Sequence, residues 1–103
     1  MLQRFKTPFP GFVFTSSSGD RLSLAPSRGG LVTSWVCSGQ ERLYFDLNRF
    51  LDPSKSIRGG IPVLFPICGN LPDDALSLPT GMYPMPQHGF ARDLPWSLHG
   101  LED

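Results

Sequence analysis

Short apolar runs separated by glycine, proline and serine dominate the first half of the chain. Two of them, Phe12–Thr15 and Arg21–Leu24, flank the sequence Ser-Ser-Ser-Gly-Asp, which is typical of two strands joined by a turn. Leu31–Cys37 is rich in β-branched and aromatic residues and predicts the strongest strand of the chain. A turn and a second run, Arg42–Phe45, follow, so residues 31–45 predict an antiparallel hairpin.

A helical period is missing from the rest of the chain. Asn48–Leu51 predicts a single helical turn that ends at Asp52-Pro53. Ile61–Pro66 is apolar enough for a strand, but its prolines cannot donate to a ladder, which predicts an edge or an irregular segment beside a cleft. Asn70–Gln87 is rich in proline and predicts a long loop. The pattern as a whole predicts an all-β protein.

Length and charge limit the possible functions. A chain of 103 residues with 40% hydrophobic residues predicts at most one domain with a modest core. Nine basic and nine acidic side chains give no net charge and form no runs, which argues against a nucleic-acid partner. The longest apolar stretch, Ile61–Cys68, is far shorter than the roughly 20 residues of a membrane helix, and no signal-peptide pattern is visible. We expect no membrane partner and a soluble, cytoplasmic protein.

The cysteines do not suggest a metal. Cys37 and Cys68 lack Cys-x-x-Cys spacing and have no histidine close by in sequence, so we expect no metal and no cofactor. Two buried, reduced thiols are the simplest prediction. A disulfide is the open alternative if the two residues lie close together in the fold.

Two glycine-containing segments carry the candidate chemistry. Arg58 precedes Gly59-Gly60, and a guanidinium beside such a turn can hold a carboxylate or phosphate through two parallel hydrogen bonds. Gln87, His88 and Arg92 lie in a second segment and could converge on one oxygen-rich anionic ligand. The alternatives are that Arg58 is an ordinary surface arginine, that His88 satisfies buried backbone groups, and that Arg92 pairs with Asp93 or Asp46.

The aromatic residues have two interpretations. Trp35, Tyr44, Phe65 and Trp96 could form a flat wall for a sugar, but most of them are expected in the core. His99 is expected to be exposed. No nucleophile with a base partner, phosphate loop or dinucleotide fingerprint is visible.

The same two segments resemble a known family. Ser-Ile-Arg-Gly-Gly-Ile-Pro-Val-Leu-Phe-Pro-Ile-Cys-Gly-Asn, followed by Gln-His-Gly-Phe-Ala-Arg-Asp-Leu-Pro-Trp, resembles the aldose 1-epimerase family in its hexose-6-phosphate mutarotase-like branch. The resemblance extends to Arg28–Trp35 and Glu41–Tyr44. It implies a galactose-mutarotase-like antiparallel β-sandwich that binds a hexose in an open cleft. It also implies that Arg58, Gln87 and Arg92 contact the substrate and that His88 lines the same pocket.

The resemblance further implies ring opening and reclosure at the anomeric carbon by a general base and a general acid. In the family these are a glutamate and a second histidine, and neither has a matching residue here, so no catalytic residue is assigned. We therefore expect residues 1–103 to be the N-terminal portion of one epimerase-like domain, inactive alone, whose partner is a missing C-terminal half. The alternatives are a non-catalytic carbohydrate or sugar-phosphate binding module, or a truncated remnant. Neither the sugar nor its phosphorylation follows from the sequence.

Overall fold

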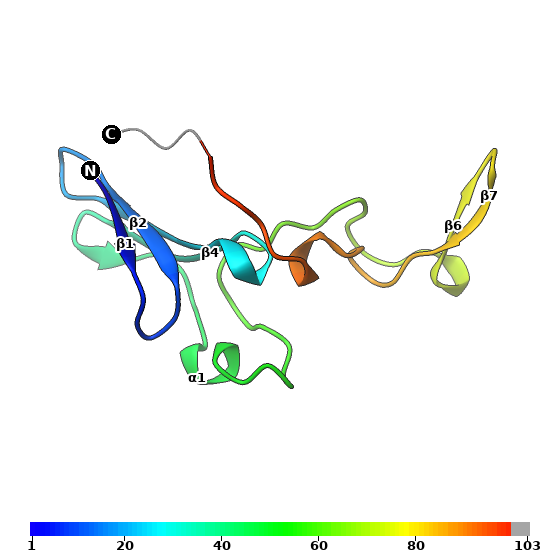
Figure 1. Ribbon diagram of the computed structural model, residues 1–103, viewed down its shortest axis with the longest axis horizontal. Coiled ribbons are helices and arrows are strands. Elements are labelled where there is room, and N and C mark those ends of the chain that lie inside the picture. The colour runs from blue at the N-terminus through cyan, green and yellow to red at the C-terminus, as the bar shows by residue number, and fades with distance from the viewer. Residues whose placement is uncertain (100–103) are drawn as a thin grey trace.

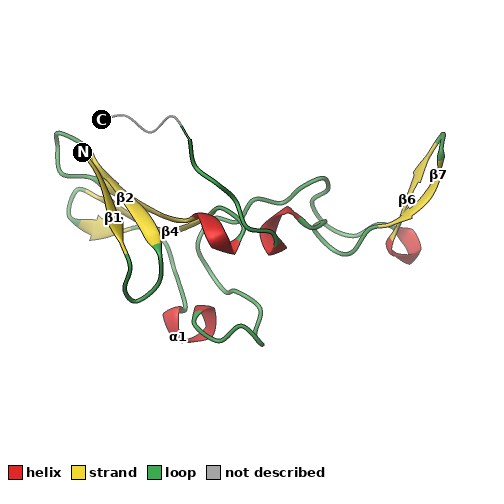
Figure 2. Cartoon of the chain, viewed as in Figure 1, coloured by secondary structure: helices red, strands yellow, loops and turns green. Residues whose placement is uncertain are grey.

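A five-stranded antiparallel sheet is the main feature of the computed structural model, which describes residues 1–99 (Figure 1). The strands follow one another in space as they do in sequence, from β1 to β5. Their bounds are β1 Leu2–Phe5, β2 Gly11–Thr15, β3 Arg21–Ala25, β4 Leu31–Cys37 and β5 Gln40–Glu41. Helix is confined to one short α-helix and three 3₁₀ turns in this part of the chain (Figure 2). The all-β prediction is confirmed. The second sheet of a sandwich is not formed by residues 1–99.

The predicted turn between β2 and β3 is confirmed, with Thr15 opposite Arg21 and Phe12 opposite Leu24. The predicted hairpin of residues 31–45 is shorter than expected, because pairing between β4 and β5 covers only Val36 with Glu41 and Cys37 with Gln40. The Glu41 carboxylate ends this ladder. It accepts hydrogen bonds from the Ser34 hydroxyl, from the Trp35 backbone N–H at 2.9 Å and from the Leu43 backbone N–H at 3.1 Å.

Strand β1 was not predicted from the sequence. Its four residues pair with β2 from Leu2 opposite Phe14 to Phe5 opposite Gly11. Met1 extends this contact, since its amino group donates to the Thr15 carbonyl and its carbonyl accepts the Thr15 N–H. Gln3 and Arg4 lie between the two apolar residues of β1 and weaken the strand signal, whereas pairing with β2 fixes their backbone.

Phe50 is the centre of the core. Helix α1 (Leu47–Phe50) is the predicted helical turn, capped by Asp46, whose carboxylate accepts the Arg49 N–H at 2.9 Å. Phe50 is 1% exposed and packs with Ala25 and Leu31. The Phe9 and Phe45 rings surround it with centroids 4.6 and 5.2 Å away. The main role of this single helical turn is therefore to position the Phe50 ring against one face of the sheet.

The prediction of a loop for residues 70–87 was wrong in its centre. Strands β6 (Ala75–Leu78) and β7 (Gly81–Pro84) form a hairpin in full register, closed at its base by the Met85 N–H donating to the Asp74 carbonyl at 2.7 Å. The hairpin lies apart from the five-stranded sheet (Figure 1). Both of its strands are edge strands, which explains why prolines at their ends are tolerated.

The chain is extended for its size. Its radius of gyration is 16.1 Å, compared with about 13 Å for a compact domain of 100 residues. Its accessible surface is 7239 Å², compared with about 5,800 Å² for a compact protein of this mass. The expectation that most of the four marked aromatic residues are core was therefore wrong. The exposed fractions are Trp35 43%, Tyr44 71%, Phe65 59% and Trp96 45%.

The cysteines are both free. Cys37 is half-buried and Cys68 is exposed, so the predicted burial was wrong. The reduced state of the two thiols stays a prediction. His99 is exposed, as expected. Within residues 1–99, no helix has the length and apolarity needed to span a membrane.

Candidate functional site

The two sequence motifs lie side by side. The Phe65 carbonyl accepts hydrogen bonds from the backbone N–H groups of Phe90 and Ala91, at 3.0 and 3.1 Å. At the other end of the contact, the His88 N–H donates to the Gly69 carbonyl at 2.8 Å, and the Gly69 N–H donates to His88 Nδ1 at the same distance. The fold therefore joins the segment after Arg58 to the segment that contains Gln87, His88 and Arg92.

The turn between β3 and β4 forms the third side of this arrangement. The Gly29 N–H donates to the Leu94 carbonyl at 3.0 Å, and the Trp96 N–H donates to the Pro26 carbonyl at 2.9 Å. Gly29 has a φ of 73°, and a Cβ atom at this position would overlap the Arg92 carbonyl. Glycine is required here because only it combines left-handed backbone with so close an approach. The first part of the resemblance, Arg28–Trp35, is thus in contact with the last.

Arg58 is held by its backbone. Its carbonyl accepts the Asp46 N–H at 3.0 Å, and the Gly60 N–H donates to the Tyr44 carbonyl at 2.7 Å. Gly59, with a φ of 88°, packs directly against the Tyr44 carbonyl, where a side chain would not fit. The Arg58 side chain is exposed and makes no hydrogen bond or ion pair within residues 1–99.

Arg92 lines a cavity of about 380 Å³. Its Nε is buried and has no hydrogen-bond partner in the described part of the chain. The alternative of an ion pair with Asp93 or Asp46 is not realised among residues 1–99. The polar and glycine residues on the walls include Arg28, Lys55, Ser56, Gly59, Arg92 and Asp93. A guanidinium that has an unpaired nitrogen and belongs to a residue lining a cavity is suited to binding an anionic ligand.

Gln87 and His88 do not line this cavity. Gln87 is exposed, and His88 is half-buried with a φ of 63°. Because Nδ1 of His88 accepts a backbone hydrogen bond, the neutral ring carries its proton on Nε2, which is its remaining donor. His88 thus satisfies a backbone group, as the alternative interpretation expected. Of the four predicted site residues, only Arg92 lines this cavity; Arg58 does not, although its neighbour Gly59 does.

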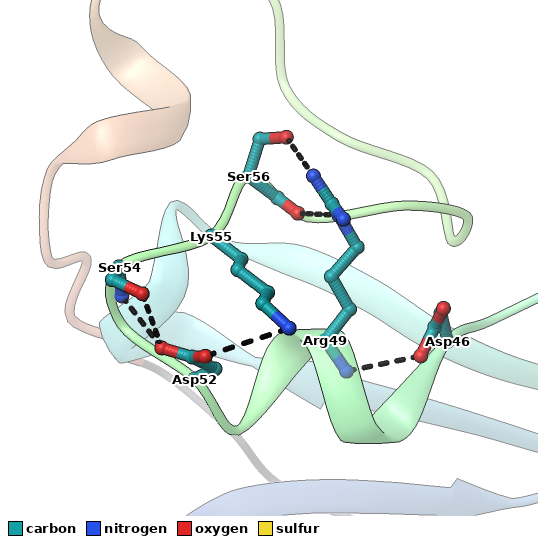
Figure 3. Close-up of polar contacts among 6 residues, drawn as sticks. All are labelled: Asp46, Arg49, Asp52, Ser54, Lys55 and Ser56. Carbon is teal, nitrogen blue, oxygen red and sulfur yellow. Dashed lines mark hydrogen bonds and ion pairs between the residues drawn. The ribbon is translucent and has the colours of Figure 1, made fainter.

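Lys55 and Ser56 were missed by the sequence analysis. They belong to the loop after α1, whose side chains are cross-linked by hydrogen bonds (Figure 3). Asp52 accepts hydrogen bonds from the Ser54 hydroxyl and backbone N–H, and these lower the pKa of Asp52. Aspartate followed two residues later by serine is a common turn signal, and it could have marked this loop as ordered. Nothing in the sequence alone places the loop beside Arg92.

Metal ligands are not assembled in this part of the protein. Within residues 1–99, no group of three or more histidine, cysteine, aspartate or glutamate side chains is placed to hold a metal ion.

Known proteins support the resemblance seen in the sequence. No protein-family model matches the chain. Three curated relatives carry the name "Putative glucose-6-phosphate 1-epimerase". The relative from Cenchrus ciliaris is 33% identical over 89% of this chain, and the one from Escherichia coli K12 is 36% identical over 69%. The relative from Salmonella typhimurium LT2 is 33% identical over 74%.

A solved structure agrees with these relatives. The crystal structure of the Slr1438 protein from Synechocystis sp. PCC 6803 matches 89% of this chain at 55% identity, with a TM-score of 0.82. The resemblance to the aldose 1-epimerase family is confirmed. The chain spans 28%, 21% and 24% of the three epimerase-like relatives and 32% of the Slr1438 protein. It therefore spans about a fifth to a third of the length of the proteins that it matches.

Proposed function

We propose that this chain supplies the sugar-phosphate-binding part of an isomerase that interconverts the α and β anomers of hexoses or hexose 6-phosphates. The observation that supports this most directly is the joining of the two motifs beside a cavity lined by Arg92, whose Nε is buried and has no hydrogen-bond partner in the described part of the chain. The cavity volume of about 380 Å³ lies within the usual range for small-molecule sites. The names of the epimerase-like relatives supply the substrate class.

Each predicted site residue has a role that its chemistry permits. Arg92 would bind the anionic group in the cavity, and Arg58, whose neighbour Gly59 lines the cavity, would reach the same group from the rim, since a guanidinium can present two parallel donors to a phosphate. The Gln87 amide and the Nε2–H of His88 would address sugar hydroxyls that extend outside the cavity, which neither residue lines. Arg58 is exposed and without a side-chain partner within residues 1–99, so its guanidinium can reorient toward a ligand without breaking an existing contact.

The proton transfers of anomerisation need a base at the C1 hydroxyl and an acid at the ring oxygen. We assign neither role to this chain, and propose that both groups come from polypeptide beyond the matched quarter to third of the relatives. The assignment of residues 1–103 as the N-terminal portion of one epimerase-like domain stays a prediction on the same ground.

Binding can be tested by calorimetry of the chain with glucose 6-phosphate and with glucose. Arg58→Ala and Arg92→Ala should each weaken glucose 6-phosphate binding by roughly 1.5 to 3 kcal/mol, because each removes hydrogen bonds to a charged group. Arg21→Ala is the matched control, since Arg21 is exposed on β3 and does not line the cavity. Equal losses in all three variants, or none in the first two, would contradict the site assignment.

Catalysis is tested separately by the exchange rate between glucose 6-phosphate anomers, measured by NMR. The 103-residue chain should bind without accelerating the exchange. A fusion to the unmatched part of the Escherichia coli relative named "Putative glucose-6-phosphate 1-epimerase" should accelerate it, and Arg92→Ala should abolish the gain. Acceleration by the chain alone would refute the proposal that the base lies elsewhere. Binding without acceleration in a folded fusion would favour the binding-module alternative.

A further inference from the structure

The cavity beside Arg92 has an excess of positive charge. Within residues 1–99, its lining includes three cationic side chains, Arg28, Lys55 and Arg92, and one carboxylate, that of Asp93. Arg28 and Arg92 belong to segments of the family resemblance already discussed. Lys55 comes from the loop after α1 and has no role assigned by the sequence or by the proposed function.

Arg28 and Lys55 differ in how firmly they are held. Arg28 donates through Nη1 to the Phe50 carbonyl at 2.8 Å, and its guanidinium lies over the Phe50 ring at 4.6 Å. It is committed to the core. Lys55 Nζ has one ion pair, with Asp52 Oδ2 at 3.8 Å, and the two side chains are 55% and 39% exposed. A long, exposed pair of this kind contributes little stability, so the Lys55 ammonium is free to change partners.

The backbone around Lys55 is, by contrast, firmly fixed (Figure 3). On its C-terminal side, Arg49 donates through Nε to the Ser56 carbonyl at 2.7 Å and through Nη2 to the Ser56 hydroxyl at 3.1 Å. On its N-terminal side, Asp52 Oδ1 accepts the Ser54 N–H at 3.0 Å and the Ser54 hydroxyl at 2.6 Å. Lys55 is therefore a mobile cation on an anchored segment at the cavity wall, an arrangement that lowers the entropic cost of binding an anion.

We propose that Lys55 is a specificity-determining residue that selects phosphorylated hexoses at this site. When a hexose phosphate enters the cavity, the Lys55 ammonium leaves Asp52 and pairs with the phosphate. Asp52 keeps its two hydrogen bonds from Ser54, so its carboxylate is not left without partners. This inference rests on the proposed function, because it assumes that the cavity beside Arg92 receives the sugar phosphate.

The chain offers a direct spectroscopic test, because Lys6 and Lys55 are its only lysines. Reductive methylation with ¹³C-formaldehyde labels both side chains and preserves their charge, and the Lys55→Met variant assigns the signals. Glucose 6-phosphate should shift the Lys55 signal in a saturable way, whereas glucose at the same concentrations should not. The Lys6 signal should stay in place, since Lys6 follows β1 and does not line the cavity.

Affinity gives the second readout on unlabelled protein. Lys55→Met should weaken glucose 6-phosphate binding by roughly five- to tenfold and leave glucose binding unchanged. Added salt should reduce the difference in glucose 6-phosphate affinity between wild type and Lys55→Met. Lys6→Met is the matched control and should have no effect. Asp52→Asn should keep or tighten the binding of glucose 6-phosphate, because it removes the anion that competes for Lys55. Circular dichroism establishes that each variant is folded.

The outcomes separate this inference from the proposed function. If Lys55→Met leaves glucose 6-phosphate binding intact, the role of Lys55 is refuted while the proposed site survives. If Lys55→Met weakens glucose binding as much as glucose 6-phosphate binding, Lys55 does not select phosphate. If inorganic phosphate shifts the Lys55 signal as strongly as glucose 6-phosphate, the contact is an unspecific surface effect and the inference fails. If the unaltered chain binds no hexose phosphate, both proposals fail for this chain.

Discussion

The interactions that stabilise the five-stranded sheet differ from those that stabilise the motif-bearing segment after Arg58. On the sheet side, the Phe9, Phe45 and Phe50 rings enclose a small apolar core. The motif side is stabilised mainly by main-chain hydrogen bonds and close glycine contacts. Its aromatic rings contribute less, since Phe65 is 59% and Phe90 is 45% exposed. Gln87, His88 and Arg92 lie on the motif side, outside this apolar core. The sheet is therefore the scaffold, and the ligand-binding groups are attached to it through backbone contacts.

The largest expected effect comes from removing the ring at the centre of the scaffold. Phe50→Ala should lower the free energy of unfolding by about 3 to 5 kcal/mol, because it deletes a fully buried aromatic side chain and leaves a cavity. Urea denaturation followed by circular dichroism measures the loss. Phe65→Ala is the matched control on the motif side, where a largely exposed ring should cost less than about 1 kcal/mol. Similar losses in both variants would show that the two sides do not differ in this way.

A second prediction concerns the contact between the two sides. Gly29→Ala should lower the free energy of unfolding by about 2 to 3 kcal/mol, because the new Cβ would meet the Arg92 carbonyl and because the backbone is left-handed. Gly39→Ala is an informative control. Gly39 also has a positive φ, 75°, but its added Cβ would meet nothing within 4 Å. Gly39→Ala should lower the free energy of unfolding by only about 1 kcal/mol, the contribution of the left-handed backbone alone.

Hydrogen exchange identifies where the Gly29→Ala damage lies. The Gly29 and Trp96 amides, which donate across the contact to the Leu94 and Pro26 carbonyls, should lose protection. The Ser23 and Val13 positions, paired within the sheet, should keep it. Loss of protection throughout the sheet would mean that the scaffold does not fold independently of the motif side.

The difference between the two sides also explains what the sequence could predict. Strands β2, β3 and β4 were predictable because apolar and β-branched residues alternate with clear turn signals. The single turn of α1 was predictable from the Asp52-Pro53 that ends it, whereas its cap at Asp46 was seen only in the structure. Strand β1 and the β6–β7 hairpin were not, because their stability comes from pairing with a neighbour and their own residues include charges or prolines.

The candidate site divides in the same way. Arg58, Gln87, His88 and Arg92 could be marked because they lie in two glycine-containing segments that carry groups able to bind an anion, and because those segments resemble the family. Their arrangement could not be predicted, because it depends on contacts such as Gly69 with His88 that are distant in sequence. Lys55 escaped notice because a single lysine in a polar loop carries no local signal. The exposure of Trp35 and Trp96 was also unpredictable, since aromatic residues in strand-like runs usually point to the core.

The smallest expected effect is polar and lies within the scaffold, at Glu41. Partial burial raises the pKa of this carboxyl, but hydrogen bonds from the Ser34 side chain and from the backbone at Trp35, Leu43 and Arg42 outweigh it and lower the pKa below its ordinary value. The unfolded chain therefore binds a proton more readily than the folded one. The stability from Glu41 is present above the unfolded pKa of about 4.3 and is lost as the pH falls through the lower folded pKa.

Glu41→Gln should remove this acid-side loss and cost about 0.5 to 1 kcal/mol at neutral pH, a modest value because the side chain is largely exposed. Urea denaturation at neutral pH and at acid pH values down to about 3 measures both changes. Ser34→Ala should shrink the difference between wild type and Glu41→Gln, since its hydroxyl is the largest of the interactions that lower the pKa. If the free energy of unfolding fell with pH equally in wild type and Glu41→Gln, another carboxylate would cause the loss of stability in acid. Ionised Glu41 would then contribute little to the stability of the end of the β4–β5 ladder.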